Sequence, residues 1–236
     1  MSPKKSGKNK VKQFAIFGIG RFGSTLATRL TELGHEVVAI DVDESIINQI
    51  APHVTHSFVA DSTDEQVLQG LDLPSFDATI VAIGSLEPNI LTTFKLQKLG
   101  VRRIISRALH SIHAEILSMI GATSIVFPER DMAIRVAYNL NSSTIVDFLE
   151  LAPDFSMIEV VVPPDLVGMR IKDSQFRNQY NVTIVAVERD TERIISPGGD
   201  FKFKEGDLLY VIGDTQSLEN LASLLTTDKN TINTLF

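Results

Sequence analysis

The chain of 236 residues contains no cysteine. Disulfide bonds, thiolate catalysis and cysteine-ligated zinc are therefore excluded, and the absence of thiols is compatible with a reducing cytosol. No apolar stretch approaches the roughly 20 residues needed to cross a bilayer, and the basic start is not followed by the hydrophobic block of a secretory signal. The sequence therefore predicts a soluble, cytoplasmic protein that does not itself span a membrane.

The body of the chain also lacks an excess of basic residues. The net charge is −7, and five of the 22 Lys and Arg lie in a polar leader, residues 1–12, that has no acids. The remainder carries 17 basic against 29 acidic residues, a balance of 17 − 29 = −12. Because a protein that binds duplex nucleic acid needs a basic footprint, we expect no nucleic-acid partner. The leader is interpreted as a flexible solubilising tail, with contact to nucleic acid or anionic lipid as the alternative.

Recognisable enzyme motifs are absent as well. Neither a GxSxG elbow nor a GxxxxGK[ST] phosphate loop occurs. His110 and His113 have a spacing that would put both on one helix face near Glu115, and a polar helix start is favoured there over a zinc site. The other three histidines fall at the sheet edge opposite to the one that binds ligands. We therefore expect that the protein is not an enzyme.

The most informative segment runs from residue 14 to residue 41. An apolar run over 14–17 leads into the glycine loop Gly18-Ile19-Gly20-Arg21-Phe22-Gly23, and a helical stretch and a second apolar run follow before Asp41. Gly18 allows a tight turn, Gly20 lets the backbone approach a pyrophosphate, and Gly23 lets the helix pack closely on the strand. Asp41 follows at about the 20-residue distance at which a carboxylate grips ribose hydroxyls. This combination predicts an adenine-nucleotide site.

The alternation of strand and helix continues beyond this first unit. Apolar strands are expected at 14–17, 37–40, 57–59, 78–82, 103–106 and 124–127, with helices at 63–70, 87–99 and 111–120. Such a pattern is typical of an α/β fold with a doubly wound parallel sheet. Ligands of these sheets bind beyond the carboxyl ends of the strands. Those ends carry Gly18, Asp41, Asp61, Gly84, Arg107 and Glu129.

Residues 128–149 have a helical pattern that is interrupted at 141–143 and resumes over 144–149. Its apolar stripe consists of Met132, Ala133, Val136, Ala137 and Leu140. Because the sheet is complete before this helix begins, the stripe either covers the sheet edge or packs on a second copy of the chain. We favour the second copy.

The last third of the chain changes character. Strands are expected at 157–162, 182–187, 193–195 and 208–212, with helices at 175–180 and 217–225. This is a small α+β unit of about 75 residues, too small to hold a separate enzyme active site comfortably. The predicted organisation is a leader (1–12), a nucleotide-binding domain (13–140), a crossover or linker (141–152), a C-terminal domain (153–228) and a tail (229–236).

Two arginines widen the choice of nucleotide. Arg21 lies in the glycine loop, where a guanidinium can chelate phosphate oxygens bidentately, and Arg107 at the fifth strand end is interpreted in the same way. The alternative for Arg21 is an exposed arginine at a helix start. An arginine at this turn broadens the candidates beyond NAD to ATP and ADP, whereas Asp41 argues against NADP because it would repel the 2′-phosphate.

Several motifs taken together resemble the RCK domain, also called KTN, the ligand-sensing module of bacterial potassium channels and transporters. They are the glycine loop, Asp41, Ala82-Ile83-Gly84, Gly121-Ala122 and the run from Pro128 to Met132. The resemblance covers about residues 12–228 and is similar in architecture to free-standing regulatory subunits of the Ktr type. It implies a Rossmann-like N-terminal subdomain followed by a small α+β C-terminal subdomain.

The resemblance also implies a site and partners. The nucleotide site would comprise Gly18, Ile19, Gly20, Arg21, Phe22, Gly23, Asp41, Val42, Asp61, Ser62, Ala82, Ile83, Gly84 and Arg107. In such subunits ATP favours the conducting state and ADP the inactive one, and Arg21 matches the arginine that distinguishes them. Glu129 matches an acid that holds Mg²⁺ or another cation at a dimer interface. Dimers would assemble into an octameric ring under a membrane-embedded potassium-translocating subunit, which places the protein at the inner face of the membrane.

The C-terminal subdomain resembles ones that bind cyclic di-AMP at a two-fold interface. The matching residues are Ile171, Phe176, Arg177, Tyr180 and Asn181, and ordinary helix surface and core is the alternative. For the whole chain, the runner-up is an NAD(H)-binding redox sensor or a small NAD-dependent oxidoreductase, because Asp41 and the glycines suit it equally well. A nucleic-acid regulator that acts through the lysine leader is disfavoured by the acidic body.

Overall fold

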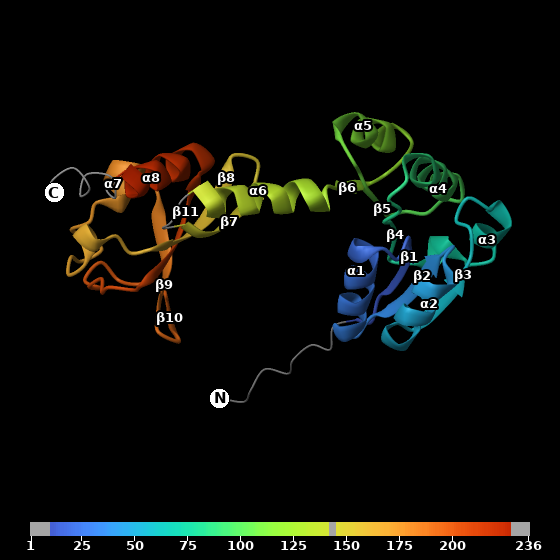
Figure 1. The fold of residues 1–236 in the computed structure, drawn as a ribbon, viewed down its shortest axis with the longest axis horizontal. Helices are drawn as coiled ribbons and strands as arrows, with labels where there is room; N and C mark the ends of the chain where they lie inside the picture. The colour runs from blue at the N-terminus through green and yellow to red at the C-terminus, as the bar shows by residue number, and fades with distance from the viewer. Residues whose placement is uncertain (1–9, 142–144, 228–236) are drawn as a thin grey trace. The chain divides into compact units, whose positions relative to one another are not determined.

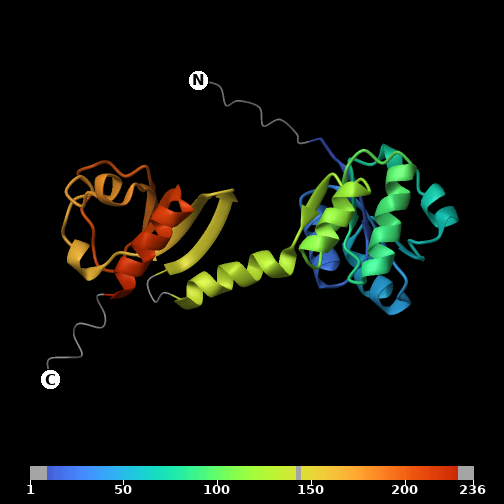
Figure 2. The ribbon, with the colours of Figure 1, turned by 90° about the horizontal axis from the view of Figure 1, so that it is seen from above.

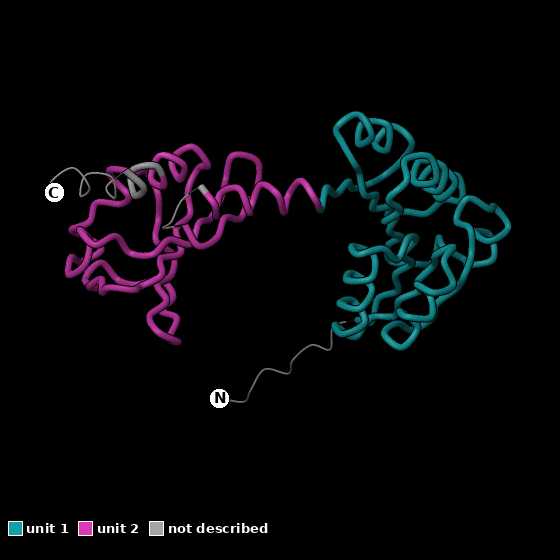
Figure 3. Tube along the Cα trace, viewed as in Figure 1, with its two compact units in different colours: residues 1–128 teal, residues 129–236 magenta. Residues whose placement is uncertain are grey.

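The computed structural model describes residues 10–141 and 145–227. The chain divides into two compact units, residues 1–128 and residues 129–236 (Figure 3). Most of the leader, up to residue 9, and the tail from residue 228 lie outside the described residues. Over the ranges 10–141 and 145–227, every helix is too short or too polar to cross a bilayer.

The first unit is built on six parallel strands, as the sequence predicts (Figure 1). They are β1 (Gln13–Phe17), β2 (Glu36–Asp41), β3 (His56–Val59), β4 (Ala78–Val81), β5 (Ile104–Arg107) and β6 (Ser124–Val126). Their order in the sheet is β3-β2-β1-β4-β5-β6. The chain therefore builds outward first on one side of β1 and then on the other, and the switch point lies between β1 and β4. A crevice for ligands is expected there, beyond the carboxyl ends of these strands.

Helices cover both faces of this sheet. They are α1 (Arg21–Glu32), α2 (Glu44–Ile50), α3 (Glu65–Gln69), α4 (Leu86–Lys98) and α5 (Ser111–Met119), with short 3-10 turns η1 (Ala51–His53) and η2 (Leu73–Ser75). Side chains alternate along β1, so Ile16 packs under α1 and α2, whereas Phe17 packs under α3 and α4. Helix α5 lies beside α4 (Figures 1 and 2). Every strand of the centre is thus buried on both faces.

Helix α2 is absent from the sequence-based expectation. It begins after Asp43, whose carboxylate accepts hydrogen bonds from the backbone N–H groups of Ser45 and Ile46. Ile47 and Ile50 then point into the core. The helix has only seven residues and two buried positions, which is too short a pattern for periodicity to reveal.

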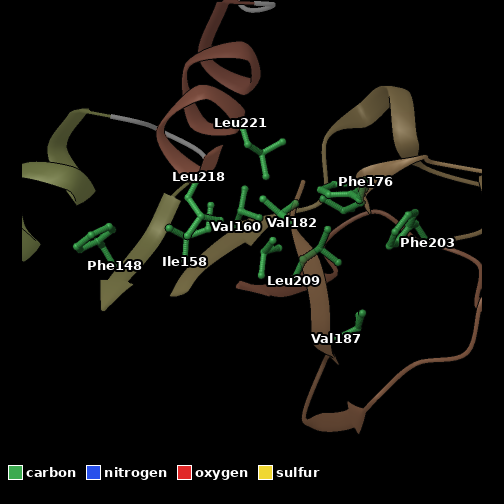
Figure 4. Packing of buried hydrophobic residues seen from close by; sticks show 12 residues of the cluster. Phe148, Ile158, Val160, Phe176, Val182, Val187, Phe203, Leu209, Leu218 and Leu221 are labelled. Carbon is green, nitrogen blue, oxygen red and sulfur yellow. The ribbon is translucent and has the colours of Figure 1, made fainter. Parts of the chain in front are cut away.

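The second unit contains a five-stranded antiparallel sheet of order β10-β9-β11-β8-β7. Its elements are α6 (Pro128–Asn141), β7 (Ile145–Ala152), β8 (Phe155–Val161), the turn η3 (Pro164–Leu166), α7 (Phe176–Tyr180), β9 (Thr183–Arg189), β10 (Glu192–Ile195), β11 (Leu208–Asp214) and α8 (Thr215–Thr227). Leu218 and Leu221 of α8 pack on Val160 and Leu209 of the sheet in one core (Figure 4).

The predicted helix over 144–149 is wrong. Residues Ile145–Ala152 form β7, which pairs with β8 and includes much of the predicted linker. Ile145 and Phe148 are buried in the core of the sheet, and the β-branched pair at 145 and 146 suits a strand better than a helix. Tyr138 of α6 stacks on Phe148 with ring centroids 3.9 Å apart. Helix α6 therefore packs with the second unit, and the division after Pro128 comes earlier than the boundary expected after residue 140.

A candidate nucleotide-binding cleft

The carboxyl ends of β1 to β5 surround a cleft of about 440 Å³ in the first unit. This volume lies within the range of roughly 300–1,000 Å³ that is usual for small-molecule sites. Among the predicted site residues, Gly18, Gly20, Asp41, Val42, Asp61, Ser62, Ala82, Ile83, Gly84 and Arg107 line it. Ile40, Ile46, Ala60, Thr63, Ser85 and Pro88 complete the lining. The sequence reasoning missed these six, although four of them directly adjoin predicted site residues.

The three glycines of the loop differ in what surrounds them. Gly18 has a φ of +88°, and a Cβ there would lie 2.8 Å from the backbone nitrogen of Ile83. A Cβ on Gly23 would lie only 2.0 Å from the carbonyl oxygen of Gly18. By contrast, nothing lies within 4 Å of a Cβ built on Gly20, which is the N-cap of α1. Two glycines thus permit close packing of backbone on backbone, and the third leaves open space at a helix N-terminus.

Asp41 is tied to the glycine loop. Its Oδ2 accepts a hydrogen bond of 2.6 Å from the backbone N–H of Ile19, and its Oδ1 accepts one of 3.0 Å from Asp43. The carboxylate therefore holds the end of β2 against the turn after β1. Each carboxylate oxygen has a further lone pair, so Asp41 can still accept a hydroxyl group in the cleft.

Asp61 and Ser62 form the rim beyond β3. The backbone and then the side chain of Thr63 donate to Asp61, and these hydrogen bonds, with the nearby Lys95, lower the pKa of Asp61. Ser62 is buried and shares a hydrogen bond of 2.8 Å with the hydroxyl of Thr92. With Asp41, the ionised Asp61 gives this side of the cleft two carboxylates. Such groups accept hydrogen bonds from hydroxyl groups such as those of a sugar.

The two predicted arginines occupy different places. Arg107 lines the cleft, and its Nη1 lies 3.6 Å from a Cβ built on Gly84. Arg21 is the first residue of α1, is exposed and does not line the cleft. Ile19 and Gly23 are buried, and Phe22 packs in the core below α1, so these three predicted residues support the loop from behind.

Matches to two family descriptions span most of the chain. Residues 14–128 match the TrkA-N domain, and residues 157–226 match the TrkA-C domain. The Ktr system potassium uptake protein C of Bacillus subtilis (strain 168) is 43% identical over 208 residues, which cover 88% of this chain and 94% of that protein. The chain belongs to the Ktr potassium uptake family. The Ktr system potassium uptake protein A of the same organism is 33% identical over 214 residues, or 90% of this chain and 96% of that protein.

These matches confirm the resemblance to RCK-type regulatory subunits that the motifs indicated. The prediction of a non-enzymatic protein also agrees with the names of these Ktr relatives, which are those of potassium uptake components. Among solved structures, the GsuK RCK domain superposes with a TM-score of 0.66 at 20% identity, covering 95% of this chain and 49% of that one. The GsuK channel bound to NAD gives a TM-score of 0.65 at 21% identity, covering 95% of this chain and 40% of that one. At such identities the likeness establishes the fold, which is that of an RCK domain.

Two other predicted sites of this Ktr family member lie in or near the second unit. Glu129 is an exposed residue in the first turn of α6 and does not line the cleft. No cluster of three His, Cys, Asp or Glu side chains suited to a metal ion occurs in residues 10–141 and 145–227.

His110 caps α5 by accepting from the backbone N–H of His113, and His113 is fully buried. These two histidines thus form the polar helix start that the sequence favoured.

The predicted cyclic di-AMP residues surround α7. Phe176 lies in the core against Tyr180 and Phe203, whereas Arg177 is exposed. Asn181 has a left-handed backbone and donates to Asp214 at 3.3 Å. Arg177, Asn181 and part of Tyr180 are therefore accessible to a ligand at the surface, and Phe176 supports them from inside.

Proposed function

We propose that the protein is a regulatory subunit of a potassium uptake system, which binds an adenine nucleotide in the cleft of its first unit. One observation carries the nucleotide assignment. A Cβ built on Gly20 would meet open space at the N-terminus of α1, and Gly20, Asp41 and Asp61 line the same cleft. Phosphates are bound by the exposed N–H groups of the helix, and ribose hydroxyls by the carboxylates. Membership in the Ktr family supports the regulatory role.

The physiological ligands we propose are ATP and ADP. Arg107 supplies a cation within the cleft, and Arg21 stands at the start of the helix whose N-terminus faces the phosphates. A guanidinium that reaches a terminal phosphate gives ATP contacts that ADP cannot make. Because ligand exchange shifts an equilibrium only through such differential affinity, ATP and ADP would stabilise different states of the protein.

The assembly we propose is a dimer that builds an octameric ring beneath a membrane-embedded potassium-translocating subunit. Met132, Val136 and Leu140 recur along one stripe of α6 and are exposed by 54%, 46% and 83%. A second copy of the chain would bury them. The protein would then lie in the cytoplasm at the inner face of the membrane, through its partner. Glu129, in the first turn of the same helix, would share Mg²⁺ or another cation across the dimer.

The second unit is proposed to bind cyclic di-AMP at a two-fold interface. Arg177 would pair with phosphate and Asn181 with a base, and Ile171 and Tyr180 would contact the purine. The exposed position of Arg177 and Asn181 beside the half-buried Tyr180 supports this assignment. Arg177→Ala should abolish cyclic di-AMP binding and leave ATP binding unchanged.

The test of the main proposal is a calorimetric titration of the purified full-length chain with ATP, ADP and NADH. We expect ATP and ADP to bind at micromolar concentration. Binding of NADH alone would favour an NAD(H) redox sensor, the second candidate, which Asp41 suits equally well. Affinity for none of these ligands below millimolar concentration would reject nucleotide sensing, and steady turnover of any of them would reject a non-enzymatic role.

Arg21→Ala tests the distinction between the two adenylates. The substitution should weaken the binding of ATP by roughly tenfold, about 1.4 kcal/mol, and change the affinity for ADP much less. Arg29→Ala, an exposed arginine near the other end of the same helix, is the matched control and should change neither. Equal losses for ATP and ADP would remove Arg21 from the sensing role.

A further inference from the structure

Helix α4 carries polar side chains on the face that it turns toward the sheet. Asn89, Thr92 and Thr93 have no exposed surface. Burying polar groups costs free energy unless they form hydrogen bonds, so the partners of these three side chains show what they hold. Those partners lie at the ends of β3, β4 and β5, and some of them line the nucleotide cleft.

Asn89 joins two of the strand ends. Its Nδ2 donates to the carbonyl oxygen of Ile83 at 3.0 Å and to that of Arg107 at 3.1 Å. Both acceptors are carbonyl oxygens, which fixes the amide with its nitrogen toward them. Ile83 and Arg107 both line the cleft. One side chain thus connects the loop after β4 with the end of β5.

The two peptide groups that Asn89 holds also set the direction of the neighbouring cleft residues. The carbonyl of Ile83 belongs to the peptide that begins Gly84. The carbonyl of Arg107 belongs to the peptide whose N–H, at Ala108, donates to Val126 of β6 at 2.9 Å. This second peptide is therefore held on both sides, by α4 and by β6. Gly84 and the guanidinium of Arg107 are neighbours, with Nη1 3.6 Å from a Cβ built on Gly84, and Asn89 hydrogen-bonds the backbone beside both.

The remaining oxygen of Asn89 makes its two donated hydrogen bonds the distinctive contribution of this side chain. Its Oδ1 is buried without a hydrogen-bond partner in the part of the chain that the structure describes. A buried acceptor left in this state lowers stability. An apolar residue of similar volume would avoid that loss. The two donated bonds to cleft loops are what an apolar residue could not replace.

We infer that Asn89 is a positioning residue of the nucleotide site, which holds Gly84 and Arg107 in the geometry that receives the ligand. This inference rests on the nucleotide site proposed above. Thr92 positions Ser62 on the rim beyond β3 in the same way, through the hydrogen bond between their hydroxyl groups. Helix α4 is accordingly the element that ties the three strand ends around the cleft together.

Asn89→Leu tests the inference, because leucine has a similar volume and no donor. Thr93→Val is the matched control: Thr93 is buried on the same helix and bonds to Ser106 at 2.9 Å, and Ser106 does not line the cleft. If the leucine variant does not fold, Asn89→Ala takes its place. The full-length variants are compared by hydrogen exchange without ligand and by titration with ATP, ADP and NADH.

We expect Asn89→Leu to accelerate hydrogen exchange at the amide of Ala108. It should also lower the affinity for the nucleotide that the wild type binds by roughly tenfold, about 1.4 kcal/mol. Thr93→Val should change neither. Unchanged exchange at Ala108 in the Asn89 variant would overturn the inference, and so would equal effects of both substitutions. If the wild type binds no nucleotide, the proposed function fails, while the exchange measurement still decides whether Asn89 positions the strand ends.

Discussion

Polar groups are used differently in the two units. At the strand ends of the first unit, Gly20 faces open space and Arg107 lines a cleft. In the second unit, charged side chains pair with one another. Arg189 holds the buried Asp207 through two bonds of 2.7 Å, and Arg193 pairs with Glu188. Polar groups at these strand ends of the first unit thus surround a cleft, whereas these ion pairs of the second unit stabilise its own fold.

This difference can be measured because the units carry different probes. The chain has three tyrosines and no tryptophan, and Tyr138, Tyr180 and Tyr210 all lie in the second unit. Tyrosine fluorescence therefore reports unfolding of the second unit, and far-UV circular dichroism reports both. A destabilising substitution in the second unit should move both signals, whereas one in the first unit should move only the circular dichroism.

The largest effect is expected at Asp207 of the second unit. Burial alone would raise the pKa of Asp207, but Arg189 and the N–H of Lys204 outweigh it and hold the pKa below its usual value. Asp207→Asn removes the charge beside Arg189 and should lower the free energy of unfolding by about 3 kcal/mol. Urea denaturation followed by tyrosine fluorescence measures this loss.

The control for Asp207 is Asp200→Asn, which removes an exposed carboxylate that pairs with Lys172. It should leave the fluorescence midpoint unchanged, because solvent screens the pair. Since the folded-state pKa of Asp207 is depressed, its contribution is present above the unfolded pKa and is lost as pH falls through the folded value. Equal midpoints for the two variants would mean that the buried pair does not stabilise the second unit.

A smaller effect is expected at the glycine loop of the first unit. Gly23→Ala places a methyl group against the carbonyl oxygen of Gly18. This overpacking should lower the free energy of unfolding by about 1–3 kcal/mol and also weaken nucleotide binding. Gly20→Ala meets no neighbouring atom, but alanine is a poorer N-cap than glycine, so the substitution should lower the free energy of unfolding by about 0.5–1 kcal/mol while still obstructing the ligand. Circular dichroism melts and nucleotide titration separate the two outcomes. A larger stability loss at Gly20 than at Gly23 would contradict this account.

The smallest effect concerns pH and the buried His113. Burial, and then the nearby His110, lower the pKa of His113. Its contribution to stability is therefore complete above the unfolded pKa of about 6.5 and declines as pH falls toward the folded value. Between these two pKa values the first unit should lose at most about 1.4 kcal/mol of unfolding free energy per pH unit. The check is to measure the free energy of unfolding by circular dichroism between pH 7.5 and 5. Its dependence on pH should be shallower for a His113→Asn variant than for the wild type. The exposed His53→Asn should keep the wild-type slope.

The sequence was sufficient to predict the six parallel strands and most of the cleft. Residues 14–17 of β1 are a continuous apolar run, and runs of this kind are recognisable because burial on both faces demands them. Residues at strand ends could be named in advance, since parallel strands bring their carboxyl ends to one edge. Strand β7 was mistaken for a helix because its pairing with β8 depends on a partner that lies beyond a turn. Propensity over six residues does not encode that partner.

Local chemistry in the sequence determined the nucleotide loop, because φ above zero and close backbone contact at Gly18 and Gly23 can be met only by glycine. Tertiary packing alone decided which side chains around that loop act together. In the sequence Asn89 is one polar residue of an amphipathic helix, and only the fold shows that the loop after β4 and the end of β5 place two carbonyl oxygens beside it. Arg21 adjoins the glycines in sequence yet lies outside the cleft, whereas the distant Arg107 lines it. The glycine turn is determined by residues that are adjacent in the sequence. Arg107, by contrast, reaches the cleft because β5 lies beside β4, which lies beside β1 in the sheet.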